Sequence, residues 1–147
     1  MTNQDEAPIG PATPELEGFV RKTLGCTCPA EVFWHVDESP REQSHNAGVV
    51  RRIAIGGRLL VYLVRAPRDD RPSSAAALMR GWVAAGLAER DAAGMNRLRI
   101  VVVLDGTHPA LQAALGRAFE AARPIGDARL HLHLIDATTA AAVLPPA

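Results

Sequence analysis

The sequence predicts an α/β fold: a four-stranded mixed sheet, built from an antiparallel hairpin and a βαβαβ unit, with helices on both faces and a short N-terminal helix. Two β-rich runs, Val49–Ile55 and Leu59–Val64, are joined by Gly56-Gly57, a strong hairpin signal. Helical and strand-like segments then alternate, which favours right-handed parallel crossovers. The run Leu59–Val64 and the residues that follow Arg99 up to Leu104 are apolar throughout, as is typical of strands that are buried on both faces.

The N-terminal part predicts a disordered segment over residues 1–12 and then a helix. Thr13–Glu15 supplies a capping threonine, a proline at the first helical position and an acid in the first turn. Gly25 is suited to a left-handed C-terminal cap. Four apolar residues at helical spacing define the buried face: Leu16, Phe19, Val20 and Leu24.

The next stretch, residues 29–36, fits either a short helix or a strand. With Cys28 as its cap, Pro29 stands at the first helical position and Glu31 at the third, which favours a helix. The alternation of apolar residues over 32–36 fits a strand equally well. Residues 37–48 predict a loop.

The remaining elements follow from caps and periodicity. Ser73 caps a helix over about 74–90, which Gly94 terminates, and Pro109 begins another over about 109–122. Strands are predicted at 99–104 and 129–135. We expect a single domain over residues 13–140 and a frayed tail over 141–147.

Composition excludes several classes of function. The net charge is zero, with 16 basic and 16 acidic residues, and aromatic residues make up only 4% of the chain. Neither a basic field nor a stacking surface for nucleic acid is therefore expected. The N-terminus lacks the charged and apolar regions of a secretory signal, and no apolar run reaches the ~20 residues that span a bilayer. We expect a cytoplasmic protein without a membrane partner.

The chain has two cysteines, Cys26 and Cys28, which are separated by one residue and followed by Pro29. A helix starting after Cys28 would favour its thiolate, whereas Cys26 would lie at the C-terminal end of the preceding helix. This predicts Cys28 as the attacking sulfur and Cys26 as the resolving one. A reducing cytoplasm argues against a permanent bridge, and so does the small ring that it would close. The alternative is a pair of inert, buried cysteines.

Two histidines, His131 and His133, alternate with leucines and therefore share one face of the last strand. If the turn at Cys26 and Cys28 packs over that face, two thiolates and two imidazoles could hold zinc or another thiophilic metal. The alternative is that both histidines are partly exposed polar positions.

Polar residues after the parallel strands form a candidate rim for an anion or a polar substrate, since ligands of open α/β sheets bind beyond the carboxyl ends of the strands. Its members are Arg65, Arg68, Asp105, Thr107 and His108. Turn and cap chemistry explains the same residues without a ligand. The polar segment Glu89–Arg97 is interpreted as a glycine-capped helix end. Its alternative is a docking or ligand rim made by Arg90, Asp91, Asn96 and Arg97.

Two segments, Leu24–Phe33 (LGCTCPAEVF) and Arg90–Arg97 (RDAAGMNR), resemble signatures of a family of small bacterial proteins with no established activity. The resemblance covers most of residues 16–135 and implies a self-contained cytoplasmic domain. Cys28-Pro29 also resembles the Cys-Pro of small sulfur-carrier proteins. Glu31 stands where those proteins have a second proline, so their function is not carried over.

These patterns lead to one hypothesis and two alternatives. The hypothesis is a thiol protein that uses Cys26 and Cys28 for redox or sulfur exchange with a partner protein. The first alternative is a non-enzymatic accessory module that binds a metal or cluster. The second is a structural partner subunit with inert cysteines.

Overall fold

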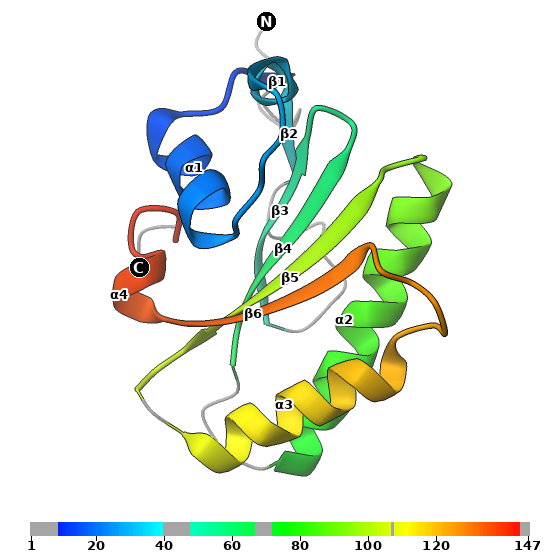
Figure 1. Ribbon diagram of the computed structural model, residues 1–147. Coiled ribbons are helices and arrows are strands. Elements are labelled where there is room, and N and C mark those ends of the chain that lie inside the picture. Colours follow the sequence, from blue (N-terminus) through cyan, green and yellow to red (C-terminus); the bar gives the residue numbers. More distant parts are fainter. Residues whose placement is uncertain (1–8, 40–47, 67–71, 107, 145–147) are drawn as a thin grey trace, which may run out of the picture.

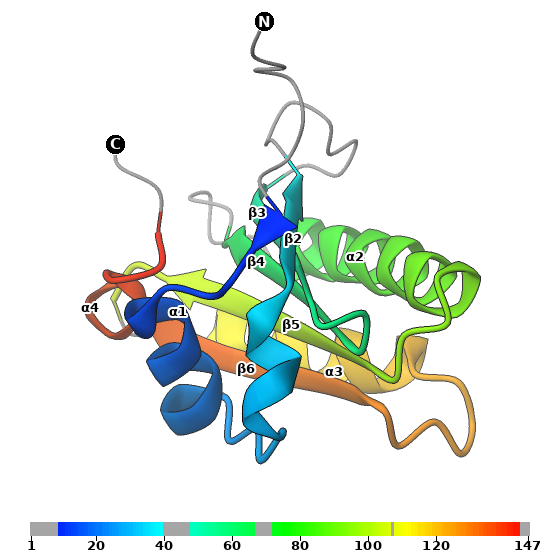
Figure 2. The same cartoon turned by 90° about the horizontal axis from the view of Figure 1, so that it is seen from above.

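The computed structural model describes residues 9–39, 48–66, 72–106 and 108–144, which form a single mixed sheet with helices on both faces (Figures 1 and 2). The strands are β1 (Ile9–Gly10), β2 (Val36–Ser39), β3 (Val49–Ile55), β4 (Leu59–Arg65), β5 (Arg97–Leu104) and β6 (Leu130–Asp136). The helices are α1 (Pro14–Gly18), the π-helical turn η1 (Phe19–Thr23), the 3₁₀ turn η2 (Ala30–Trp34), α2 (Pro72–Ala92), α3 (Pro109–Ala122) and α4 (Ala137–Ala140).

The strands lie in the order in which they occur in the chain, from β1 to β6. Pairing is antiparallel from β1 to β4 and parallel from β4 to β6. The predicted α/β class, the hairpin and the βαβαβ unit are therefore confirmed. Gly56 and Gly57 form the hairpin turn with φ of +61° and +66°, which only glycine adopts without strain.

The prediction of four strands is wrong, because residues 36–39, which the sequence assigned to the preceding segment and to a loop, form β2, and the two-residue β1 pairs beyond it. Asp37, Glu38 and Ser39 have low strand propensity. Pairing with β3 overrides that preference, and the Glu38 carboxylate accepts hydrogen bonds from Arg51 of β3, at 2.5 Å from Nε and 2.7 Å from Nη2. The rest of the predicted loop, residues 40–47, lies outside the described part of the chain.

Each face of the sheet has its own hydrophobic core. Helices α2 and α3 cover one face, where Trp82 and Phe119 pack against the even-numbered residues of β4 and β5. The N-terminal helical segments and α4 lie on the opposite face, where Phe19 and Phe33 pack against odd-numbered residues. This alternation explains why β4 up to Val64 and β5 after Arg99 are apolar throughout.

The predicted N-terminal helix is confirmed, with a π-helical last turn that the sequence did not predict. The Oγ1 atom of Thr13 accepts a hydrogen bond from the amide of Leu16 at 3.2 Å, and Gly25 has φ of +74°. The four residues of the predicted buried face are at most 7% exposed. Order begins before residue 13, because β1 pairs with β2 and Ala12 donates to the carbonyl of Phe33 at 2.8 Å. Residues 1–8 lie outside the described part.

Both interpretations of residues 29–36 hold in part. Residues 30–34 form the single 3₁₀ turn η2, and β2 begins at Val36. The amide of Gly56 donates to the carbonyl of His35 at 2.7 Å, so the hairpin turn fixes the end of η2. The tail also differs from the expectation, because Val143 is 2% exposed and its carbonyl accepts a hydrogen bond from Arg51 at 2.6 Å.

From Arg90 to Met95 the polar segment after α2 is structural, as its glycine cap predicted, whereas Asn96 and Arg97 line a cavity. Gly94 has φ of +68°, and the amide of Met95 donates to the carbonyl of Arg90 at 2.8 Å. Arg90 is 2% exposed, and its guanidinium binds both carboxylate oxygens of Asp127 at 3.2 and 2.8 Å. Arg90 therefore joins the end of α2 to the turn before β6 and is not part of a docking rim.

Acid should weaken the fold through Asp127. Its hydrogen bonds from Arg90, opposed by burial, lower its pKa to about 2. The folded pKa lies below that of the unfolded chain, so this contribution to stability is complete above pH ~4 and is lost as the pH falls toward 2. We expect Asp127→Asn to be less stable at neutral pH and to lose less stability on acidification than the parent, as measured by urea midpoints at pH 6 and pH 3.

The control is Glu120→Gln, which neutralises an exposed carboxylate with 66% side-chain exposure. It should leave the acid dependence of the parent nearly unchanged. An equal loss of stability in the parent and in Asp127→Asn would show that Asp127 does not cause the acid sensitivity.

Candidate functional site

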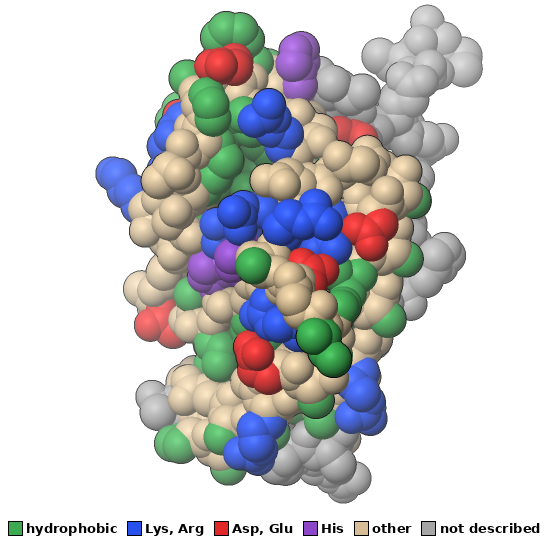
Figure 3. Space-filling model, turned by 45° about the vertical axis from the view of Figure 1, so that its right-hand side comes forward, with side chains coloured by type: hydrophobic (Ala, Val, Ile, Leu, Met, Phe, Trp, Pro, Cys, Tyr) green, Lys and Arg blue, Asp and Glu red, His purple; other side chains and the backbone are tan. Residues whose placement is uncertain are grey.

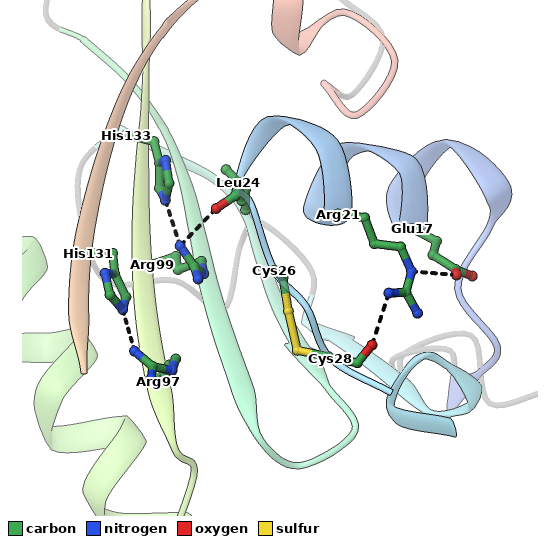
Figure 4. Close-up of a disulfide and its surroundings, with 9 residues drawn as sticks. All are labelled: Glu17, Arg21, Leu24, Cys26, Cys28, Arg97, Arg99, His131 and His133. Carbon is green, nitrogen blue, oxygen red and sulfur yellow. Dashed lines mark hydrogen bonds and ion pairs between the residues drawn. A yellow bond between two sulfur atoms is a disulfide. The ribbon is translucent and has the colours of Figure 1, made fainter. Parts of the chain in front are cut away.

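Cys26 and Cys28 are joined by a disulfide bond, with their Cα atoms 5.6 Å apart (Figure 4). Gly25 ends the preceding helical turn, and the amide of Cys26 donates back to the carbonyl of Val20 at 3.1 Å. Cys26 is 7% exposed in the core beneath η1, whereas Cys28 is half-buried. The pair thus presents one buried and one accessible sulfur-bearing residue.

The backbone at Cys28 is held in place by Arg21 of the N-terminal helical segment. Arg21 donates to the carbonyl of Cys28 at 2.9 Å and to the carboxylate of Glu17 at 2.9 Å (Figure 4). The same guanidinium lies over the ring of Phe33, 4.6 Å from its centroid. This cation–π contact and the two hydrogen bonds fix the segment that carries the disulfide.

The predicted helix start at Cys28 is wrong. The turn that follows is a five-residue 3₁₀ turn capped by Pro29, without a side-chain cap. One short turn has no macrodipole comparable to that of an α-helix, so the expected activation of the Cys28 thiolate by a helix N-terminus is not supported. Burial, and not a helix dipole, distinguishes the two cysteines.

A cavity of about 450 Å³ lies beside the disulfide. Cys26 and Cys28 line one part of it, and Arg58, Arg97 and Arg99 line another. Arg58 precedes β4 and Arg97 begins β5, and the two are brought together because the carbonyl of Arg58 accepts a hydrogen bond from the amide of Arg97 at 3.0 Å. The amino ends of two parallel strands thus place three arginines in the cavity that both cysteines line.

Two arginine–histidine pairs extend this site across the sheet. Arg97 lies 2.7 Å from Nε2 of His131, and Arg99 lies 3.0 Å from Nε2 of His133 (Figure 4). Burial, reinforced by Arg99, lowers the pKa of both histidines, to about 4 for His133. The imidazoles are therefore neutral at neutral pH, and their Nε2 atoms accept hydrogen bonds from the guanidinium groups.

The four residues predicted as zinc ligands are not assembled as a metal centre. Cys26 and Cys28 are bonded to each other, and His131 and His133 direct their Nε2 atoms at arginines. Throughout the described ranges, no three His, Cys, Asp or Glu residues gather in a way that could hold a metal ion. The donor set therefore does not fit zinc in this arrangement.

Only part of the predicted polar rim, Arg65, Asp105 and His108, lies in the described part of the chain. Arg65 and Asp105 are exposed, and His108 has Nε2 2.7 Å from the carbonyl oxygen of Asp105. Arg68 and Thr107 lie outside the described residues. Ligand crevices of open α/β sheets occur where the strand order reverses. Here β4, β5 and β6 follow one another and both crossover helices cover the same face, so the described strands contain no such reversal.

Arg58 and Arg99 belong to a site that the sequence did not reveal. The available signal was the spacing of Arg97 and Arg99, since alternate residues of a strand share a face. His131 and His133 share that face in the neighbouring strand, where Arg99 is in register with His131. Their cavity depends on the approach of the Cys26–Cys28 turn, which no local pattern predicts.

No protein-family model, curated protein or solved structure matches this chain. The resemblance of its two segments to small bacterial proteins therefore stays a prediction, and the function has to be inferred from the site. None of the helices in the described ranges is both long and apolar enough to cross a membrane.

Proposed function

We propose that Cys26 and Cys28 form a redox couple that exchanges two electrons with a dithiol of a partner protein. The observation that carries the proposal is the bonded pair itself, with Cys28 half-buried at a cavity and Cys26 buried behind it. Their backbone conformation allows the two sulfurs to bond, and thiol–disulfide exchange needs access to one sulfur only.

The exchange starts with attack of a partner thiolate on Sγ of Cys28. The Cys26–Cys28 bond breaks, a mixed disulfide forms at Cys28, and Cys26 leaves as a thiolate that takes a proton from solvent. The partner's second thiolate then attacks the partner's first sulfur, which is bonded to Cys28, and Cys28 is released as a thiolate. Two electrons and two protons have then passed from the partner dithiol to this chain, and the reverse sequence oxidises a partner.

The surroundings of the disulfide support the reduced state. Arg97 and Arg99 line the same cavity as both cysteines, and a positive charge nearby stabilises a departing thiolate and lowers the pKa of its thiol. Cys28 is therefore expected to be the attacked sulfur, and Cys26 the resolving one, because of access and charge.

The test is a titration in dithiothreitol buffers and then in glutathione buffers, with the thiols trapped by iodoacetamide and counted by intact mass. We expect interconversion of the two-thiol and disulfide forms at a defined midpoint, within the range of about −300 to −120 mV that cytosolic and oxidising thiol couples cover. A chain that stays in one form across that range would rule out the couple.

Single substitutions should expose the asymmetry of the two thiols. The Cys26→Ser variant keeps the Cys28 thiol, and the Cys28→Ser variant keeps the Cys26 thiol. The thiol of the first variant should react with iodoacetamide at least about tenfold faster, because Cys28 is half-buried and Cys26 is buried. Circular dichroism of both variants controls for folding. Equal rates would contradict the assigned roles.

A further inference from the structure

The cavity beside the disulfide carries positive charge without a matching negative charge. Arg58, Arg97 and Arg99 line it, and none of its other lining residues is acidic. Figure 3 shows Lys and Arg side chains gathered on one face of the molecule, with His side chains beside them. Because the chain has no net charge overall, this local excess is a property of the site and not of the composition.

Neutral groups hold the two arginines of β5 in place. Arg99 donates to the carbonyl of Leu24 at 3.0 Å and to neutral His133, and Arg97 contacts neutral His131. Such partners orient a guanidinium group without cancelling its charge. In other parts of the described chain, arginines of comparable burial contact carboxylates, as in the pairs Arg51–Glu38, Arg52–Glu89 and Arg90–Asp127.

Arg99 also has hydrogen-bonding capacity that the protein does not use. Its Nε atom is buried and lacks a partner among the described residues. Burial, together with repulsion from Arg97, lowers the pKa of Arg99. A bound anion would relieve that repulsion and would supply acceptors to groups that have been removed from water.

We propose that this cavity binds the anionic groups of a low-molecular-weight thiol that carries carboxylates, and that such a thiol can reduce the disulfide in addition to a partner dithiol. The inference rests on the proposed redox function. A volume of about 450 Å³ is within the range of small-ligand sites. Arginines are suited to carboxylates because their planar donors form paired hydrogen bonds.

The reaction consumes two thiols for each disulfide. The thiolate of the first bound thiol attacks Cys28 and forms a mixed disulfide, while Cys26 leaves and is protonated. A second thiolate attacks the sulfur of the first, and the products are the small-molecule disulfide and reduced Cys28. The two thiols lose two electrons and two protons together, and the protein disulfide gains them.

The test compares three thiols of different charge as reductants of the Cys26–Cys28 disulfide: mercaptosuccinate, 1-thioglycerol and cysteamine. Rates are expressed per thiolate and corrected for thiol basicity. We expect mercaptosuccinate to react about tenfold faster than neutral thioglycerol, as one or more charge-assisted hydrogen bonds predict, and cysteamine to be slowest. High salt should reduce the preference.

Arg97→Gln and Arg99→Gln should each lose most of the preference for mercaptosuccinate. Because both charges also stabilise the departing thiolate, the rate with thioglycerol should fall as well, but by less than the rate with mercaptosuccinate. Arg117→Gln is the matched control, since Arg117 is exposed on α3 and lines a different hollow. It should behave like the parent. The proposal would be overturned if the parent showed no preference for mercaptosuccinate, or if Arg117→Gln lost that preference to the same extent as Arg97→Gln and Arg99→Gln.

Succinate, which has no thiol, separates the anion site from the redox function. Its binding to Cys26→Ser/Cys28→Ser is measured by NMR titration, with Arg97→Gln in the same background as the control. Binding that Arg97→Gln abolishes supports the anion site even if no thiol reduces the disulfide, an outcome that would reject the redox function alone. If thiols reduce the disulfide without a preference for mercaptosuccinate, and succinate does not bind, the anion site alone is rejected.

Discussion

Replacing Arg90 with methionine should lower the free energy of unfolding by about 3–5 kcal/mol, the usual cost of removing one partner of a buried ion pair. The Arg90 side chain is 3% exposed and that of Asp127 is 11% exposed. Methionine leaves the carboxylate of Asp127 without its main partner, and the carbonyl of Arg129 loses a hydrogen bond at 3.3 Å. The turn before β6 would lose its connection to α2.

The measurement is urea unfolding at neutral pH, with Arg80→Met as the control. Arg80 is exposed on the same helix, so its replacement should cost less than 1 kcal/mol. The double variant Arg90→Met/Asp127→Ala completes a cycle and should recover part of the loss, because no charge is then left unpaired. A cost below 1 kcal/mol for Arg90→Met would contradict the structural role of the pair.

Gly56→Ala should cost about 2–4 kcal/mol, from a strained backbone and a collision with a neighbouring turn. At φ of +61°, an added Cβ would lie 2.5 Å from the carbonyl oxygen of Val32, which is backbone and cannot rotate away. The substitution would push the hairpin away from η2. Since only Pro29 separates η2 from Cys28, the effect reaches the disulfide segment.

Gly57→Ala is the matched control for this prediction. Its φ is +66°, yet an added Cβ would meet no atom within 4 Å. It should therefore cost only the strain of a left-handed alanine, about 1–2 kcal/mol. The difference between the two urea midpoints isolates the contact with Val32, and equal costs would show that η2 does not pack tightly on the hairpin.

The elements with strong local signals were predictable from the sequence. Helix α3 begins and ends at the predicted residues, because Pro109 starts it and its apolar residues recur at helical spacing. The hairpin followed from Gly56-Gly57 and the cap at Thr13 from its neighbours. Each of these signals lies within a few residues, along the sequence, of the turn or helix end that it specifies.

Strand β2 could not be predicted in the same way. Residues 37–39 have a composition that is typical of loops, and only the free edge of β3 and the carboxylate–guanidinium contact of Glu38 with Arg51 make them a strand. Strand β1 depends in turn on β2, with which it pairs. Errors of this kind are expected at sheet edges, where the pairing partner decides the conformation.

The sequence by itself determined the α/β class, the hairpin, the crossover helices and the proximity of Cys26 to Cys28, because each depends on residues close together in the chain. Only the tertiary structure decided which charges surround the disulfide. Arg58 lines the cavity from the hairpin turn and Arg97 and Arg99 line it from β5, while His131 and His133 contact arginines and do not complete a metal site. Register and burial between distant segments set these contacts, and no local pattern encodes them.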